Sequence, residues 1–187
     1  FKALLKNPKS DVTVLLITFF LTVIFDLTVA IEVGLLIACV LFMKRVMETT
    51  DISVIKNEID PNNESDLEVH EEHLMVPEGV EVYEINGPYF FGIATKFEEI
   101  MSELGDRPKV RIIRMRKVPF IDSTGIHNLT NLCEMSKKEN IHIVLSGVNE
   151  KVHKVLEKAG FYDLLGEDNI CPNINVALEK AKAIVEK

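Results

Sequence analysis

A short polar run in the second half of the chain has residue types that can cap a helix and can carry or contact an anionic group such as phosphate. Asp122 is followed by Ser123, Thr124 and Gly125, between an apolar stretch and a segment with helical periodicity. Asp is a favoured N-cap residue, and the N–H groups of the first helical turn have no partner inside the helix. A phosphate on Ser123 would add about −1.5 to −2 charges beside those N–H groups. The run predicts a phosphorylation or anion-contact site, or simple capping chemistry, and the sequence leaves both open.

The other residues that could do chemistry are scattered along the chain. His70 and His73 enclose two glutamates, but zinc proteases need His residues four apart with a Glu directly after the first. We interpret this segment as part of a charged linker. No nucleophile has a base at motif spacing, and His127 either lies near Ser123 or is a partly exposed helix residue. Three widely spaced cysteines do not make a disulfide framework. We therefore expect no enzyme, no bound metal and no cofactor.

The chain divides sharply in composition. It has 187 residues, a net charge of −8 and 47 % hydrophobic residues, yet residues 12–43 are almost entirely apolar while the rest is rich in charge. Binding of nucleic-acid phosphates needs clustered Lys and Arg, and the sequence has no such cluster. We therefore expect a membrane as partner of the apolar stretch, and no nucleic acid.

The apolar stretch 12–43 has the length of a membrane hairpin with short arms. A spanning helix needs about 20 apolar residues, so the stretch is long for one span and short for two. A carboxylate in hydrocarbon costs about 2.5–3.5 kcal/mol, so we place Asp26 at a turn between helices 12–25 and 27–43. Basic residues flank both ends, which favours an even number of passes. Residues 1–45 thus form a predicted transmembrane hairpin. Glu32 is either a proton or ion site or an acid near the start of the second helix.

An acidic linker, residues 46–77, leads from the hairpin to a domain at 78–187. The linker includes a predicted strand at 52–55 and a loop from 60 to 78 around Pro61. From residue 80 onward, short segments with the apolar pattern of strands are separated by segments with helical periodicity. This order predicts crossover units and parallel strands. The predicted strands are 80–85, 89–92, 109–115 and 141–145, and the predicted helices are 94–104, 123–140, 149–159 and 175–186.

These elements predict an α/β fold with a mixed sheet of four or five strands and helices packed on it. The first two strands are expected to form an antiparallel hairpin around the turn at 86–88. Helix 149–159 is expected to turn Val152, Val155 and Leu156 toward the sheet. The residues expected to face inward from helix 123–140 are Ile126, Leu129, Leu132, Cys133, Met135 and Ser136.

The run around Asp122 resembles the signature of a known domain. The residues that carry the resemblance are Phe120, Ile121, Asp122, Ser123, Thr124 and Gly125, followed by an apolar helix. They are similar to the signature of the STAS domain, which bacterial anti-sigma-factor antagonists share with the cytosolic tails of SulP anion permeases. Runs 144–148 and 155–161 resemble the next strand and helix of that domain. Runs 18–23 and 26–34 resemble the last two membrane helices of a SulP permease.

The resemblance implies the C-terminal part of a SulP-family secondary anion transporter for sulfate, bicarbonate or a related anion. The STAS domain would be cytoplasmic and would regulate or assemble a multi-pass permease of the inner (plasma) membrane. The implied partners are the rest of the permease, a second copy in a homodimer, and a regulatory protein or nucleotide at the STAS domain. In antagonists of the family a kinase phosphorylates the serine after the aspartate, which here is Ser123, and Thr124 is the neighbouring alternative.

A second hypothesis is a stand-alone phospho-switch protein of the anti-sigma-factor-antagonist type. Such a protein would bind a partner kinase through the surface around Ser123. The apolar stretch 12–43 separates the two hypotheses, because a soluble antagonist has no use for it.

Overall fold

The computed structural model describes residues 9–48, 50–55, 58–59, 74–90, 97, 100 and 107–186. Its contacts divide the chain into two compact units, Phe1–Thr49 and Thr50–Lys187. In its described residues, the first unit holds two helices, α1 (Lys9–Ile24) and α2 (Leu27–Glu48). The second holds a five-stranded sheet with helices packed on both faces.

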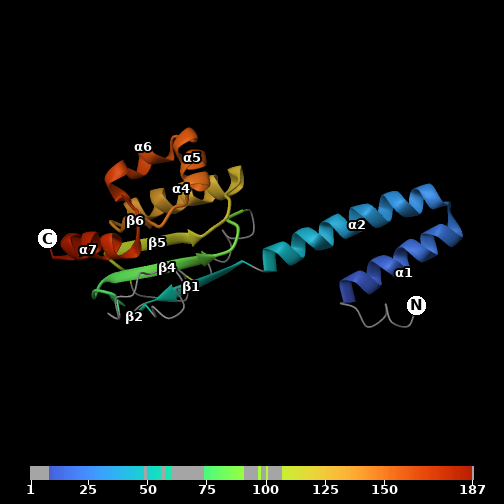
Figure 1. The fold of residues 1–187 in the computed structure, drawn as a ribbon, viewed down its shortest axis with the longest axis horizontal. Coiled ribbons are helices and arrows are strands. Elements are labelled where there is room, and N and C mark those ends of the chain that lie inside the picture. The colour runs from blue at the N-terminus through green and yellow to red at the C-terminus, as the bar shows by residue number, and fades with distance from the viewer. Residues whose placement is uncertain are drawn as a thin grey trace. The chain divides into compact units, whose positions relative to one another are not determined.

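The helices α1 and α2 lie side by side and are joined at Asp26 (Figure 1). The Oδ1 atom of Asp26 accepts a hydrogen bond from Val29 N at 2.9 Å, so this carboxylate caps α2. The predicted turn at Asp26 is confirmed. The predicted end of the second helix at residue 43 is wrong, because α2 continues to Glu48 through Lys44 and Arg45, which are good helix formers.

One of the two helices is long and apolar enough to cross a membrane. This segment of α2, Leu27–Val46, has 20 residues and a mean hydropathy of 2.2. The apolar part of α1, Val12–Ile24, is shorter. A Cβ added to Gly34 would lie 2.7 Å from Thr18 Oγ1, so the glycine lets the two helices approach closely. Glu32 is exposed on α2, and its role stays a prediction.

The sheet of the second unit has the strand order β1-β4-β5-β6-β7 (Figure 1). Its strands are β1 (Asp51–Ile55), β4 (Val80–Asn86), β5 (Val110–Lys117), β6 (His142–Ser146) and β7 (Ile170–Cys171). β4, β5, β6 and β7 pair in parallel, and β1 is antiparallel to β4. The predicted mixed α/β sheet is confirmed, with five strands. A separate two-stranded sheet joins β2 (Glu58–Ile59) to β3 (Leu74–Met75), so the last part of the predicted loop from 60 to 78 includes a strand.

The antiparallel strand of the five-stranded sheet is not the one that the sequence predicts. We expected residues 89–92 to pair with β4 as a hairpin. Instead, Tyr89 forms an isolated parallel bridge with Ile121, and residues 91 and 92 lie outside the described part of the chain. The partner of β4 is β1, the strand predicted inside the acidic linker, whose Asp51 lies opposite Asn86.

The reason is that β1 already occupies the free edge of β4. Thr50 fills the space beside the turn, since a Cβ added to Gly87 would lie 2.9 Å from Thr50 Oγ1. Gly87, with a φ of +121°, donates its N–H to Lys117 O at 3.3 Å. The chain leaving β4 is therefore held beside the end of β5 and does not fold back along β4.

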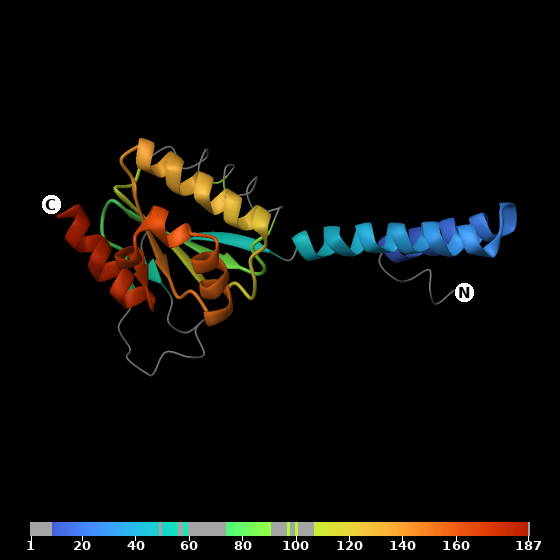
Figure 2. The same cartoon turned by 90° about the horizontal axis from the view of Figure 1, so that it is seen from above.

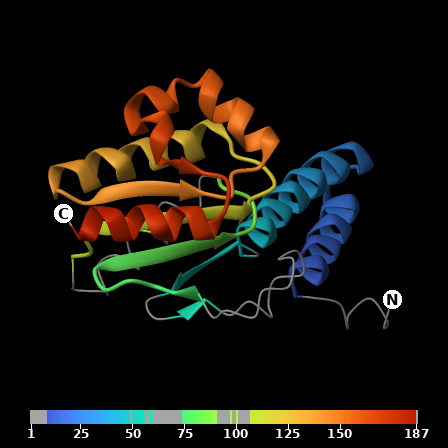
Figure 3. The same cartoon turned by 60° about the vertical axis from the view of Figure 1, so that its left-hand side comes forward.

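The helices cover the two faces of the sheet unequally (Figures 2 and 3). One face carries α4 (Ser123–Lys138), α5 (Glu150–Lys158) and α6 (Phe161–Leu165), and the other carries α7 (Ile174–Val185). Large aliphatic and aromatic side chains fill the first face, while valines and alanines dominate the second. A short 3₁₀ helix, η3 (Glu167–Asn169), follows α6. Of the predicted helix 94–104 the structure describes only Phe97 and Ile100, and both are helical.

Two side chains that were expected to face the core are exposed instead. Val155 on α5 is 39 % exposed, while Val152 and Leu156 are buried. α5 has only nine residues, and the side that faces the sheet is a narrow stripe of residues four apart, Val152 and Leu156. On α4, Met135 is 48 % exposed, whereas the adjacent Ser136 is buried.

Candidate functional site

The helix α4 begins at the polar run that carries the candidate chemistry. Asp122 has extended backbone angles, φ −98° and ψ 177°, and its Oδ1 accepts a hydrogen bond from Gly125 N at 2.6 Å. Its carbonyl oxygen accepts a hydrogen bond from Ile126 N at 2.9 Å. Asp122 is therefore the N-cap of α4, and Ser123 and Thr124 occupy the first turn with exposed side chains.

Gly125 brings the first turn of α4 against the backbone of another segment. The glycine is buried, and a Cβ at this position would clash with the carbonyl oxygen of Tyr89. It would also lie 2.8 Å from Tyr89 Cδ1 and 2.9 Å from Ile121 Cγ1. These separations are well below the optimal carbon–carbon contact of about 3.5–4.0 Å. The close approach therefore requires glycine.

Tyr89 and the loop before α4 hold each other through backbone hydrogen bonds. Tyr89 N donates to Phe120 O at 3.0 Å, and Asp122 N donates to Tyr89 O at 3.3 Å. The Tyr89 ring is buried, and this burial, with a smaller contribution from nearby Cys133, raises the pKa of its hydroxyl above the usual 10.0. The Tyr89 phenol therefore stays neutral.

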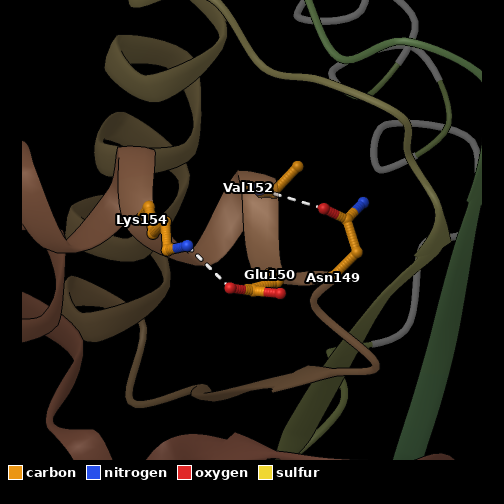
Figure 4. Close-up of polar contacts among 4 residues, drawn as sticks. All are labelled: Asn149, Glu150, Val152 and Lys154. Atoms are coloured by element: carbon orange, nitrogen blue, oxygen red, sulfur yellow. Dashed lines mark hydrogen bonds and ion pairs between the residues drawn. The ribbon is translucent and has the colours of Figure 1, made fainter.

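Asn149 ties the loop before α4 to the start of α5. Its Oδ1 accepts a hydrogen bond from Val152 N at 3.0 Å and so caps α5 (Figure 4). Its Nδ2 donates to the carbonyl oxygen of Val118. The same figure shows the exposed ion pair between Lys154 Nζ and Glu150 Oε1, at 2.6 Å, one helical turn apart. Asn149 is not among the site residues predicted from the sequence. Its position before a helical run marks a cap, but nothing local marks the bond to Val118.

The loop before α4 presents an aromatic side chain to solvent. Phe120 is 51 % exposed, and its ring stacks on that of Phe90 with 6.2 Å between centroids and 15° between planes. Stacking of this kind holds an exposed ring in one orientation. Together with Ser123 and Thr124, Phe120 forms the exposed surface at the amino end of α4. Exposed, ordered aromatic rings are frequent anchors of protein interfaces.

His127 lies one turn after Ser123 on α4, and its ring contacts Asn131. His127 Nε2 lies 3.2 Å from Asn131 Nδ2, which is one turn further along the exposed side of α4. In the described ranges, no three or more His, Cys, Asp or Glu side chains are grouped so that they could hold a metal ion. His70 and His73 lie outside those ranges. What the site provides is the amino end of α4, where modification of the exposed Ser123 or Thr124 would change the surface charge.

A second polar group is buried between the sheet and the carboxyl half of α4. Arg111 Nη1 donates to Ser136 Oγ at 2.9 Å, and the guanidinium carbon lies 5.3 Å from the centroid of the Tyr83 ring. The Tyr83 hydroxyl donates to Glu81 Oε2 at 2.7 Å. Burial and then this bond raise the pKa of Tyr83, so the hydroxyl remains a donor. Charged residues are rarely buried unless paired, so the sequence did not mark Arg111 and Glu81 as buried.

Comparison with known proteins places this arrangement in a family. The STAS domain model matches residues 73–177. A solved sulfate transporter family protein from Wolinella succinogenes is 40 % identical, with a TM-score of 0.60, and the match covers 69 % of this chain and 100 % of that chain. YvdB of Bacillus subtilis, whose name assigns it to sulfate transport, is 28 % identical over 173 residues, which cover 89 % of this chain and 29 % of YvdB.

A further match extends over the helices of the first unit. The matched structure is that of the murine solute carrier 26 family member A9 anion transporter in its inward-facing state. The match covers 97 % of this chain and 30 % of the transporter chain. The TM-score is 0.72 and the sequence identity is 18 %, so this likeness shows the fold alone.

The strand order, the capped start of α4 and the family match define the second unit as a STAS domain. The chain belongs to the sulfate transporter (SulP) family. It spans 29 % of the length of the Bacillus subtilis relative.

Proposed function

We propose that this chain is the C-terminal part of a SulP-type secondary anion transporter, in which the STAS domain regulates or assembles the permease. The observation that carries the proposal is that one chain joins an apolar helix of membrane-crossing length, α2, to a STAS domain. A stand-alone phospho-switch protein has no use for such a helix. Because the chain spans 29 % of YvdB, the transport activity of the whole protein is part of the proposal.

The proposed location is the plasma (inner) membrane, with several passes and with the STAS domain on the cytoplasmic side. Lys44 and Arg45 lie at the end of α2 that leads to the STAS domain, as the preference of basic residues for the cytoplasmic side requires. Cys133 and Cys171 are buried and form no disulfide, which suits a reducing compartment. The proposed partners are the rest of the permease and a second copy of the protein in a homodimer.

Transport by the whole permease in sealed vesicles tests this function. The name of YvdB points to sulfate, and bicarbonate is the first alternative anion. Uptake of labelled sulfate or bicarbonate that exceeds uptake by protein-free vesicles supports the proposal. A correctly inserted permease that moves neither anion, nor any other small anion, contradicts it.

The proposed regulatory site is the amino end of α4. A phosphate on Ser123 or Thr124 would add about −1.5 to −2 charges beside the carboxylate of Asp122, where like charges repel. We expect Ser123→Asp to leave folding nearly intact, because this side chain is exposed, and to change transport or partner binding. The matched control is Asn175→Asp, which adds one charge in the first turn of α7. Transport and partner binding that are equal in wild type and Ser123→Asp would contradict a switch at this site.

The domain boundary is also part of the proposal. The sequence predicts that residues 78–187 fold alone, while β1 adds Asp51–Ile55 to the same sheet. We expect both fragments 50–187 and 78–187 to fold, with the shorter one less stable because it loses the edge strand and the burial of Ile52. Burying one such side chain contributes about 1.5–3 kcal/mol to the free energy of unfolding. Urea unfolding of both fragments measures the difference, and a molten or aggregated 78–187 fragment would refute the predicted boundary.

A further inference from the structure

The carboxyl end of α4 borders a cavity far from the candidate site. Its volume is about 320 Å³, and it lies where α4 ends and β6 begins, with α6 and η3 on the other side. Ser123 and this cavity are at opposite ends of a helix of 16 residues, which is about 24 Å long. The volume lies at the lower end of the range of ligand sites, roughly 300–1,000 Å³.

The floor of the cavity is apolar and uncharged. It includes Cys133 from α4, Ile143 from β6 and Leu165 from α6. Burial raises the pKa of the Cys133 thiol to about 12, so the sulfur is a neutral group at cytosolic pH. Cys133 and Ile143 are each 7 % exposed, and Leu165 packs against the same core. A ligand that reaches this floor needs an apolar body.

The rim of the cavity carries hydrogen-bond donors and a fixed positive charge. Lys137 supplies the charge, and Asn140, His142 and Asn169 supply polar groups. In the part of the chain that the structure describes, no Asp or Glu lines the cavity. The carboxyl end of a helix carries roughly half a negative charge, which the full charge of Lys137 exceeds. The rim is therefore complementary to an anionic group on the ligand.

We propose that this cavity is a binding site for a small organic carboxylate, with its apolar body on the Cys133 floor and its carboxylate at Lys137. Sulfate does not fit the same chemistry, because it is polar on all sides and would bring no apolar surface to the floor. The site is separate from the surface around Ser123, and it does not depend on which anion the permease moves. Since Cys133 and Lys137 belong to α4, an occupied cavity contacts the same helix that presents Ser123.

Ligand-observed fluorine NMR on the full chain in lipid nanodiscs tests the proposal, with 4-(trifluoromethyl)benzoate as the probe. We expect saturable broadening of the probe signal that hexanoate reverses, that sulfate at equal concentration does not reverse, and that is absent from protein-free nanodiscs. The neutral analogue 4-(trifluoromethyl)benzamide should bind at least about ten-fold more weakly, since one charge-assisted contact contributes about that factor.

Two neighbouring lysines provide a matched pair of variants. Lys137→Glu should weaken probe binding at least about ten-fold, by reversing the charge at the rim. Lys138→Glu makes the same charge change one residue further on, outside the lining, and should change the affinity less than about two-fold. Leu164→Trp narrows the rim at a side chain that is already partly exposed, and it should abolish binding without altering the charge.

Three results would overturn the proposal. The first is the absence of saturable binding to folded wild-type protein. The second is equal binding of the benzoate and the benzamide, which would make the site one for neutral ligands. The third is an equal loss in Lys137→Glu and Lys138→Glu, which would show a general effect of surface charge. Circular dichroism of each variant serves as the control for folding.

Discussion

The two ends of α4 are held against the rest of the STAS domain by different kinds of contact. At the amino end, Gly125 places helix backbone directly against the carbonyl oxygen of Tyr89, and Asp122 caps the first turn. At the carboxyl end, side chains separate the helix from the sheet, among them Ser136 on Arg111 and Cys133 on the cavity floor. The first kind of contact leaves no space for another atom. The second leaves gaps, and the cavity lies there.

This difference suggests a division of roles along one helix. Where backbone meets backbone, the position of α4 is fixed, so a change of charge at Ser123 alters the surface without moving the helix. Where side chains form the contact, they can repack around a small molecule. The comparison can be tested by substitutions that should have large effects at one end and small effects at the other.

The largest effect is expected from Gly125→Ala. The added methyl group would overlap the carbonyl oxygen of Tyr89, and overpacking against backbone costs about 1–3 kcal/mol or more. We expect a loss of about 3 kcal/mol in the free energy of unfolding, measured by urea denaturation of residues 50–187. The neighbouring exposed position is the control, since Thr124→Ala should change stability by less than about 0.5 kcal/mol. A loss below about 1 kcal/mol in Gly125→Ala would mean that the Tyr89 segment yields easily, against the idea of a fixed amino end.

The same chemical change at two serines of α4 compares the ends directly. Ser136→Ala removes the acceptor of Arg111 Nη1 and leaves a buried cationic donor unpaired, which costs about 1–3 kcal/mol. Ser123→Ala alters an exposed side chain and should be nearly neutral. Urea denaturation of both variants gives the difference. Equal stabilities would show that the buried pair of Arg111 and Ser136 contributes no net stability.

The cap at Asp122 should contribute a smaller amount. Asp122→Ala removes the acceptor of Gly125 N, and loss of a cap costs about 1 kcal/mol. Asp122→Asn keeps an acceptor and should retain most of the stability, which separates the hydrogen bond from the charge. Urea denaturation of both variants measures the two contributions. If Asp122→Asn proved as destabilising as Asp122→Ala, the charge of Asp122 beside the helix dipole would contribute more than its hydrogen bond.

The smallest effect at neutral pH is the one linked to the proton on the Cys133 thiol, which changes stability only at high pH. Burial raises the pKa of its thiol from 9.0 to about 12, so the folded domain keeps a proton that the unfolded chain releases. The associated stability is fully present below pH 9 and is lost as the pH rises toward 12. In Cys133→Ala the fall in stability between pH 9 and 12 should be less steep than in wild type. The smaller contribution of Cys133 to the raised pKa of Tyr89 is lost in the same variant and acts in the same direction. Parallel curves for the two proteins would contradict the buried position of the thiol.

Features that depend on residues close together in the chain could be predicted. Asp26 and Asp122 each bond to an N–H group three residues ahead, so the bend in the apolar stretch and the start of α4 followed from local sequence. The alternation of apolar runs likewise predicted a mixed sheet with parallel strands. The polar run around Ser123 and the apolar stretch before it were sufficient to suggest the family.

Features that depend on distant residues could not be predicted. The edge strand β1 pairs with β4 across a long stretch of chain, and local pattern favoured the wrong hairpin at 89–92. Arg111 and Ser136 are 25 residues apart, and neither the strand nor the helix pattern indicates that they bond. The second bond of Asn149, to Val118, spans 31 residues.

The sequence by itself thus determined most of the longer elements, the caps at Asp26 and Asp122, and the family of this protein, because capping and hydrophobic periodicity act over a few residues. Only the tertiary structure decided which strand closes the sheet, which charged groups are buried and where space remains beside α4. These depend on how surfaces far apart in the chain fit together, and the fit of side chains at Cys133 and Lys137 leaves the cavity.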